Sequence, residues 1–151
     1  MLRLTKLTDY GILLMTRMAS PDQGLFAATE LSETTRIPAP TVSKILQTLL
    51  HEGMLESTRG AKGGYRLARP AAEINVRDII TVFEGSIALT ECNLDSWSCD
   101  QSEVCSTSSN WKRINVAMLQ ALASISLEDM TEQGFVPVFR LQRGMALTEV
   151  H

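Results

Sequence analysis

The sequence predicts a mainly α-helical fold that contains one small β-hairpin. Apolar residues recur at helical spacing in several stretches between residues 2 and 124. Two short strand candidates flank a segment with three glycines in six residues, which is the pattern of a hairpin. The chain has 151 residues, 44% of them hydrophobic, so we expect one compact domain with an appendage rather than a disordered chain.

Three helices are expected in the first third of the chain. Residues 2–19 carry leucines and methionines near helical spacing, and residues 27–35 form a second, shorter helix. The segment 37–40 contains two prolines and ends that helix. Pro40 also suits the first turn of a third helix over residues 40–52, because the N–H that proline lacks has no helical partner there.

A hairpin should follow the third helix. Residues 54–58 and 65–68 are the strand candidates, and residues 59–64 form the tip between them. The glycines allow this tip to turn sharply and to approach another backbone closely. The order helix, short helix, turn, helix, hairpin is that of a winged helix-turn-helix domain, which we assign to residues 1–70.

The second half of the chain should add two helices separated by a polar loop. Asn75 can cap a helix over residues 76–84, and the loop covers residues 86–108. A longer helix over residues 108–124 carries an apolar seam at spacings of three and four residues, which suits a dimerisation helix. The seam consists of Trp111, Ile114, Met118, Leu122 and Ile125.

The chain ends in a short capped segment and a tail. Ser126 can cap a last short helix, because Asp129 follows three residues later. We therefore assign residues 71–130 to the polar loop and the dimerisation helix. Residues 131–151 show little pattern and are expected to be a loose C-terminal tail.

Charge is distributed unevenly along the chain. Residues 1–70 contain nine Lys or Arg and six Asp or Glu, a net charge of +3, whereas residues 71–151 contain five and eleven, a net charge of −6. A basic half suits a phosphate-binding surface even though the whole chain has a net charge of −3. The sequence shows no bilayer-spanning stretch and no signal-peptide pattern, so we expect a cytoplasmic protein.

The third helix and the hairpin tip provide the candidate DNA-binding residues. A recognition helix presents short polar side chains to base edges, and cations on a wing bind phosphates or a narrow minor groove. We therefore expect double-stranded DNA as a partner. The candidates are Thr41, Ser43, Lys44, Gln47 and Thr48 on the helix, and Arg59, Lys62, Gly63 and Gly64 at the tip.

Three cysteines, Cys92, Cys99 and Cys105, lie within 14 residues of the polar loop. Their odd number and a reducing compartment argue against a disulfide framework. Thiolates are ligands of iron–sulfur clusters and zinc, but the spacing lacks the paired Cys-x-x-Cys of a zinc ribbon. Carboxylates in the same loop should raise the pKa of these thiols, which argues against a thiolate nucleophile. These carboxylates are Glu91, Asp95, Asp100 and Glu103.

These motifs resemble the bacterial winged-helix transcription regulators of the IscR/NsrR family, which sense iron–sulfur clusters. The resemblance covers about residues 1–130 and is carried by the opening 4–10, the wing 59–67 and the three cysteines followed by Trp111. The residues around Cys92 and Trp111 most resemble the subgroup that regulates the SUF operon for iron–sulfur cluster assembly.

The resemblance implies a homodimer that is joined through the long helix and binds a pseudo-palindromic operator. It also implies an iron–sulfur cluster held by the three cysteines and one other ligand, with [2Fe–2S] favoured over [4Fe–4S]. By position it places Pro40, Thr41, Ser43 and Lys44 at the base-reading start of the recognition helix, and it makes Arg59 the wing arginine.

The fourth cluster ligand is the point at which the chain departs from part of the family. Some members place a histidine three residues after the third cysteine, where this chain has Ser108. Other relatives use an aspartate in the first helix of the partner subunit, and Asp9 occupies that position. Asp9, the loop carboxylates Glu91 and Glu103, and Ser108 are therefore all open as the fourth ligand.

The leading interpretation is a repressor of iron–sulfur assembly genes that senses the occupancy of its own cluster. A nitric-oxide or redox sensor of the same fold is the close alternative, because the sequence does not specify the target genes. An electron-transfer protein is less suited, since a shielded carrier normally presents four thiolates. An enzyme is not expected, because the chain lacks a Ser/His/Asp set, a His-Glu-x-x-His motif and a P-loop.

Overall fold

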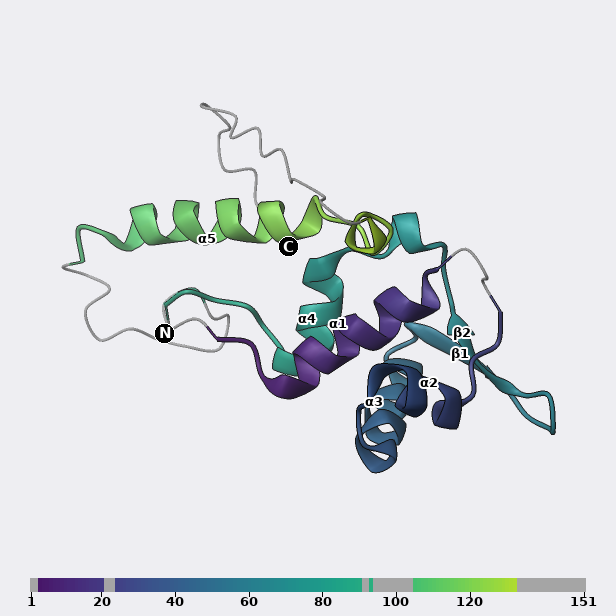
Figure 1. Cartoon of the computed structure of the whole chain (residues 1–151). Coiled ribbons are helices and arrows are strands. Elements are labelled where there is room, and N and C mark those ends of the chain that lie inside the picture. Colours follow the sequence, from purple (N-terminus) through teal and green to yellow (C-terminus); the bar gives the residue numbers. More distant parts are fainter. Residues whose placement is uncertain (1–2, 21–23, 91–92, 94–104, 133–151) are drawn as a thin grey trace.

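The computed structural model describes residues 3–20, 24–90, 93 and 105–132. Within them it contains five α-helices, a two-stranded antiparallel sheet and two short 3₁₀ helices, so the predicted mainly helical fold with a hairpin is confirmed (Figure 1). No described helix is long and apolar enough to cross a membrane. The elements are α1 (Lys6–Met18), α2 (Ala28–Thr35), α3 (Ala39–His51), β1 (Leu55–Thr58), β2 (Gly64–Leu67), η1 (Ala71–Glu73), α4 (Val76–Glu84), α5 (Ser108–Ala123) and η3 (Asp129–Thr131).

Helix α1 begins later than the predicted helix over residues 2–19. The side chain of Thr5 accepts a hydrogen bond from the backbone N–H of Thr8 (3.4 Å), which caps the helix so that it starts at Lys6. The described residues before this cap are not helical. The predicted start was wrong because apolar residues at helical spacing also precede Thr5, the residue that caps the helix.

Helices α2 and α3 form the predicted helix-turn-helix. Helix α2 ends at Thr35, and the next residue, Arg36, has a left-handed backbone conformation (φ 58°) that turns the chain toward α3. Helix α3 starts one residue earlier than predicted, at Ala39, and Pro40 lies in its first turn as expected. The positive φ angle of Arg36 and the prolines at the start of α3 therefore set the turn between the two helices.

The hairpin of β1 and β2 is joined to the segment before α2. The two strands pair antiparallel, with Leu55 opposite Leu67. Phe26 adds a one-residue bridge to β2, because its backbone N–H and carbonyl both bond to the backbone of Tyr65 at 2.9 Å. This bridge fixes the orientation of the wing relative to the helix-turn-helix.

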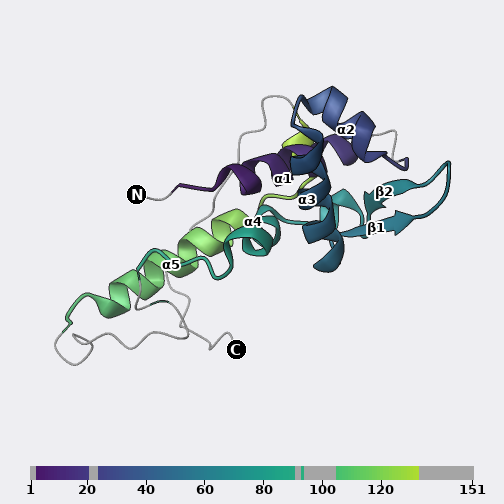
Figure 2. The ribbon, with the colours of Figure 1, turned by 90° about the horizontal axis from the view of Figure 1, so that it is seen from below.

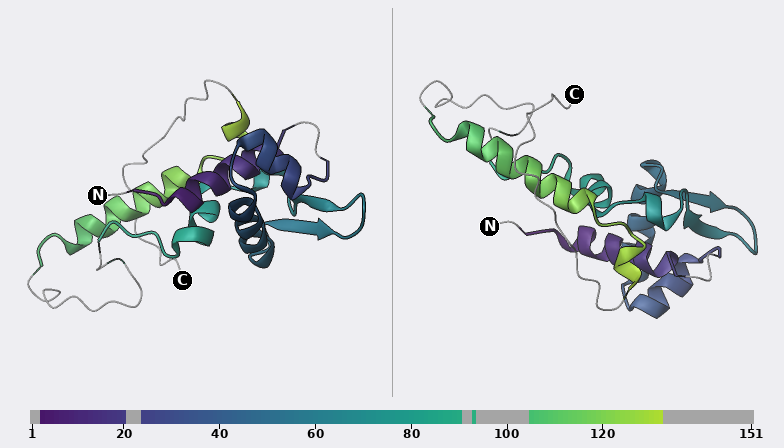
Figure 3. Two further views of the ribbon diagram at one scale, coloured as in Figure 1. Left: turned by 60° about the horizontal axis from the view of Figure 1, so that its bottom comes forward. Right: turned by 90° about the horizontal axis from the view of Figure 1, so that it is seen from above.

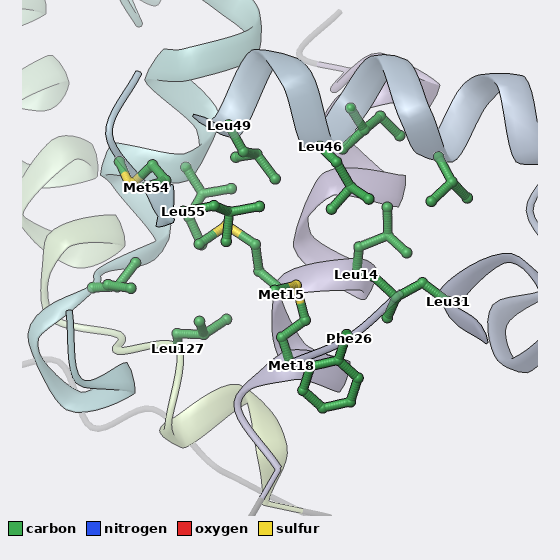
Figure 4. Packing of buried hydrophobic residues seen from close by; sticks show 14 of the residues in the cluster. Leu14, Met15, Met18, Phe26, Leu31, Leu46, Leu49, Met54, Leu55 and Leu127 are labelled. Carbon is green, nitrogen blue, oxygen red and sulfur yellow. The ribbon is translucent and has the colours of Figure 1, made fainter. Parts of the chain in front are cut away.

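One hydrophobic core joins α1, α2, α3 and the hairpin, and extends to α4 and to the segment after α5. Figure 4 shows Leu14 and Met15 of α1 lying beside Leu46 and Leu49 of α3. Leu127, which follows α5 in the sequence, is fully buried in the same cluster. The position of the recognition helix is therefore determined by its packing on α1.

Helix α4 leads from this core toward the cysteine segment, which is the stretch over residues 86–107 that contains Cys92, Cys99 and Cys105. Asn75 caps α4 as predicted, because its side chain accepts a hydrogen bond from the N–H of Asp78 (2.9 Å), and Gly85 (φ 76°) ends the helix. Helix α5 projects away from the rest of the domain (Figures 2 and 3). The segment after α5 returns to the start of α4, where the N–H of Val76 donates to the carbonyl of Ile125 (2.9 Å).

Candidate DNA interface and cysteine segment

The outer face of α3 presents the residues that the sequence predicts to meet DNA. Pro40, Lys44 and Gln47 are exposed and recur at spacings of four and three residues, so they share one ridge of the helix. Thr41 and Ser43 lie half-buried beside this ridge. The opposite side of α3 is packed into the core, which leaves the polar ridge facing solvent.

The tip of the wing presents two cations. Arg59 and Lys62 are exposed, and neither forms an ion pair within the part of the chain that the structure describes. Arg66 on β2 differs, because its Nε (3.0 Å) and Nη2 (2.7 Å) donate to one carboxylate oxygen of Glu56 on β1. The hairpin leaves the domain beside α3 (Figure 2), so its cationic tip extends from the surface next to the recognition helix.

Gly63 and Gly64 are required by the packing of the wing itself. A Cβ atom at Gly63 would overlap the carbonyl oxygen of Thr58, and a Cβ atom at Gly64 would lie 2.7 Å from the carbonyl oxygen of Phe26. The predicted close approach of these glycines to another backbone is therefore present, and that backbone belongs to the protein itself. Contact of either glycine with DNA stays a prediction.

Of the three predicted cysteine ligands, Cys92 and Cys99 lie outside the described residues, and Cys105 lies within them. Cys105 has a free, half-buried thiol shortly before α5. The hydroxyl of Thr107, 3.5 Å from Sγ, holds the pKa of the Cys105 thiol below its usual range. The backbone N–H groups of Thr107 and Ser108 act in the same direction.

For Cys105 the expectation of a raised pKa is wrong, because donors at the start of α5 stabilise its thiolate. Cysteine binds metals as the thiolate, so the lowered pKa is compatible with a ligand role for Cys105, which stays a prediction. Ser108 donates its hydroxyl to the carbonyl of Cys105 (3.3 Å), while Glu91 and Glu103 lie outside the described residues. The described residues alone, without Cys92 and Cys99, assemble no group of three metal-binding side chains.

Asp9, the predicted fourth ligand, lies on the exposed side of the first turn of α1. It directly follows Thr8, which is fully buried. Its carboxylate forms no ion pair with any residue that the structure describes. Leu13, one turn further along α1, is 46% exposed, so an apolar side chain and a carboxylate share this surface. The role of Asp9 as a ligand stays a prediction.

Two further residues join the cysteine segment to the helices, and sequence reasoning missed both. Glu84 accepts hydrogen bonds from the backbone N–H of Thr5 (2.8 Å) and from the hydroxyl of Thr8. These bonds, the one from Thr8 first, hold the pKa of the Glu84 carboxyl below its usual range. The buried Asn115 of α5 accepts a hydrogen bond from the N–H of Leu89 (2.9 Å). No local sequence signal connects residues so far apart along the chain.

A helix-turn-helix with a polar recognition face and a hairpin with a cationic tip define a winged-helix DNA-binding regulator. Residues 4–133 match the sequence profile of the Rrf2 family, which is described as an iron-dependent transcriptional regulator. The chain therefore belongs to the Rrf2 family. Members of this family are DNA-binding transcription regulators rather than enzymes, so the prediction that the protein is not an enzyme is confirmed.

Relatives of known name support the same assignment. Protein aau3 of Rhizobium meliloti is 30% identical over 132 residues, which cover 87% of this chain and 86% of that protein. The regulator NsrR of Shouchella clausii is 28% identical over 131 residues, or 85% of this chain and 88% of that one.

Solved structures agree with these relatives. The structure of CymR, the global cysteine regulator of B. subtilis, has a TM-score of 0.69 and 28% identity, covering 87% of this chain and 97% of that one. The structure of T. potens IscR has a TM-score of 0.64 and 28% identity, covering 85% of each chain. The resemblance to the IscR/NsrR family is therefore confirmed.

Proposed function

We propose that the protein represses iron–sulfur cluster assembly genes in the cytoplasm, with the occupancy of its own iron–sulfur cluster as the signal. The observation that carries the proposal is the set of three cysteines, Cys92, Cys99 and Cys105, within 14 residues. The family is described as iron-dependent, and NsrR and IscR proteins are among its similar members. The sequence around Cys92 and Trp111 points to the SUF assembly operon as the target.

Three cysteines leave one position of the cluster to a different ligand. Cys92, Cys99 and Cys105 would hold the iron, with Asp9 of the partner subunit as the fourth ligand. A bound cluster, with [2Fe–2S] favoured over [4Fe–4S], supplies a redox-active group that is sensitive to iron supply, oxygen and nitric oxide. In this proposal the loop carboxylates and Ser108 are the alternatives to Asp9.

Helix α5 supports a homodimer because it has two different faces. One face carries the buried Asn115 and lies against the segment before the cysteines. The other face carries the predicted seam, on which Trp111 is 40% exposed and Ile114 is 48% exposed. Large apolar side chains aligned along a projecting helix mark an interaction surface, so we infer that the α5 helix of a second copy covers the seam.

In the dimer, two recognition helices would meet the half-sites of a pseudo-palindromic operator about 34–36 Å apart. Residues 1–70 would bind DNA, residues 71–130 would hold the cluster and dimerise, and residues 131–151 would form a tail. The cluster changes DNA affinity only if the protein binds it differently in the two arrangements of these helices. The DNA-binding residues would be Pro40, Thr41, Ser43, Lys44, Gln47, Arg59, Lys62, Gly63 and Gly64.

The test is anaerobic purification followed by iron and sulfide analysis, visible absorption and Mössbauer spectroscopy. We expect iron and inorganic sulfide in equal amounts, and loss of the visible absorption when Cys92, Cys99 or Cys105 is changed to alanine. Far-UV circular dichroism should show that these variants remain folded, because the described core is built from other residues. Zinc in place of iron under strict anoxia would contradict the proposal.

A nitric-oxide or redox sensor is the second candidate, favoured by the similarity to NsrR. Both candidates predict the same cluster, so the experiment must compare how operator affinity responds to each signal. Operator affinity of the loaded protein should be measured after nitric oxide and, separately, after removal of iron by a chelator. Loss of operator affinity after stoichiometric nitric oxide, at chelator concentrations that leave the cluster and the affinity unchanged, would favour the second candidate.

A further inference from the structure

The C-terminal end of α4 is bonded to the N-terminal end of α1. Oε1 of Glu84 accepts hydrogen bonds from the backbone N–H of Thr5 (2.8 Å) and from the hydroxyl of Thr8. Thr8 and Asn115 are the buried polar residues among those that the structure describes. The bond to Glu84 satisfies the hydroxyl of Thr8. A carboxylate at this place is also favoured by the partial positive charge of the helix N-terminus.

Apolar packing reinforces the same junction. Phe83 precedes Glu84 and lies against Gly11 of α1 so closely that a Cβ atom at Gly11 would overlap the phenyl ring. The polar contact of Glu84 and the close contact of Phe83 therefore fix the last turn of α4 against the first two turns of α1. Both contacts join the same two helix ends.

This junction lies between the cysteine segment and the DNA-binding face. Directly after Glu84, Gly85 ends α4 and the chain continues toward the cysteines. On the other side of the junction, Thr8 precedes Asp9, and α1 packs through Leu14 and Met15 on the recognition helix α3 (Figure 4). The start of the cysteine segment is therefore connected to α3 through two directly packed helices, α4 and α1.

We propose that Glu84 is a positioning residue that couples the cysteine segment to the recognition helix through α1. The inference rests on the proposed function, since it assumes that the state of the cysteine segment changes DNA affinity. Loss of a contact that only stabilises the fold would lower the free energy of unfolding and leave the response to the cluster intact. Loss of a coupling contact would alter the response itself.

The experiment compares Glu84→Gln, Glu84→Ala and Thr8→Val with the control Glu73→Gln. Gln at position 84 keeps an acceptor oxygen and removes the charge, and Val at position 8 removes only the hydroxyl donor. Glu73 is exposed on η1, and its side chain forms no hydrogen bond or ion pair with the described residues. Two quantities are measured: amide exchange of residues 5–12 in metal-free protein, and the ratio of operator affinities of loaded and empty protein.

We expect faster amide exchange at the start of α1 in all three variants, and a ratio of affinities that moves toward one by about fivefold or more in Glu84→Ala. Glu84→Gln should show a smaller change, and the control should match wild type. A wild-type ratio in Glu84→Ala that remains folded would overturn the proposal, whatever its stability.

The two proposals fail in different ways. If wild-type protein shows no cluster-dependent affinity, the proposed function fails, while amide exchange in metal-free protein still tests the junction. Unchanged exchange of residues 5–12 in Glu84→Ala would then overturn the positioning role of Glu84 independently.

Discussion

At the scale of single residues, the wing depends on glycines that have no room for a side chain. Gly64 lies where the backbone of Phe26 approaches β2 to form its bridge with Tyr65. We predict that Gly64→Ala breaks this bridge and lowers the free energy of unfolding by about 1–3 kcal/mol, as overpacking does. Thermal and urea unfolding measure the effect, and Ala61→Ser at the exposed tip is the control.

This substitution also separates two roles of the glycine. If Gly64 only contacts DNA, the variant would weaken operator binding with unchanged stability, and our structural explanation would be refuted. If Gly64 serves the wing, stability and binding should fall together.

The carboxyl group of Glu84 makes stability depend on pH. Its pKa is lowered in the folded protein by the hydroxyl of Thr8 and the N–H of Thr5, so the ionised form is favoured by folding. This contribution is complete above the ordinary pKa of a glutamate and is lost as the pH falls through the lowered pKa. We predict that Glu84→Gln removes this part of the acid destabilisation, an effect of about 1 kcal/mol or less because the group is exposed.

The measurement is urea unfolding of wild type and Glu84→Gln between about pH 6 and pH 3. Asp129, whose pKa is also lowered, by its bonds to Ser126, is present in both proteins and contributes equally. Identical pH profiles for the two proteins would show that Glu84 does not gain from ionisation in the folded state.

The residues that sequence reasoning identified are those whose partners are local. Asn75 caps α4 as predicted, and Ser126 and Asp129 bond reciprocally through N–H groups and side chains at 2.8 and 3.0 Å. The helix expected after Ser126 is reduced to a single 3₁₀ turn. Glu84 was missed because its partners are 79 and 76 residues away, and their proximity is decided by how α4 packs on α1.

At the scale of elements, the hairpin contains one free and one neutralised arginine. Arg59 at the tip has no ion-pair partner among the described residues, whereas Arg66 is held by Glu56. We predict that Arg59→Ala lowers the slope of log operator affinity against log salt concentration by about one, because one phosphate contact is lost. Arg66→Ala should change the slope much less, since its charge is already paired within the protein.

The two arginine variants have the same change in net charge, so they control for each other. Fluorescence anisotropy over a series of salt concentrations gives both slopes. Equal slopes for the two variants would mean that general charge, rather than the position of Arg59, determines binding.

Helix α5 should be the element that holds two subunits together. We predict that Ile114→Glu converts the dimer into a monomer, because it places a charge within the exposed apolar seam. Gln120→Glu adds the same charge at an exposed position outside the seam and should remain dimeric. Sedimentation or light scattering distinguishes the two, and a dimeric Ile114→Glu variant would place the interface elsewhere.

Periodicity predicted the elements well and their ends less well. The predicted helix over residues 76–84 matches α4 fully, since Asn75 and Gly85 terminate it by local chemistry. The long helix was predicted from its seam, but the second face of α5, which contains Asn115, was not recognised. A buried asparagine is identified only by the partner that satisfies it, and that partner, Leu89, lies in the loop.

At the scale of the whole molecule, both ends of the cysteine-containing region are fixed to the DNA-binding core. Before it, Glu84 is bonded to α1. After α5, Leu127 is buried in the same core as the recognition helix, and its N–H donates to the carbonyl of Ile74 (2.7 Å). The described residues on both sides of the cysteines are therefore attached to the core that holds the recognition helix.

Asp9 is the residue through which this arrangement would extend across the dimer. It lies on the exposed start of α1, next to the Glu84 junction, and has no ion-pair partner among the described residues. We predict that it supplies an oxygen ligand to the cluster of the other subunit. A carboxylate is a harder ligand than a thiolate and holds iron of a cluster less tightly, so this position would be the site of attack by oxygen or nitric oxide.

The test is Asp9→Ala purified under anaerobic conditions, with Glu73→Ala as an exposed carboxylate outside the junction. We expect an altered visible spectrum, severalfold faster loss of absorption in air, and a smaller difference in operator affinity between loaded and empty protein. The last effect follows because α1 would no longer be joined to the loop of the other subunit. An unchanged spectrum and unchanged stability in air would exclude Asp9 and leave Glu91, Glu103 and Ser108 as the candidates for the fourth ligand.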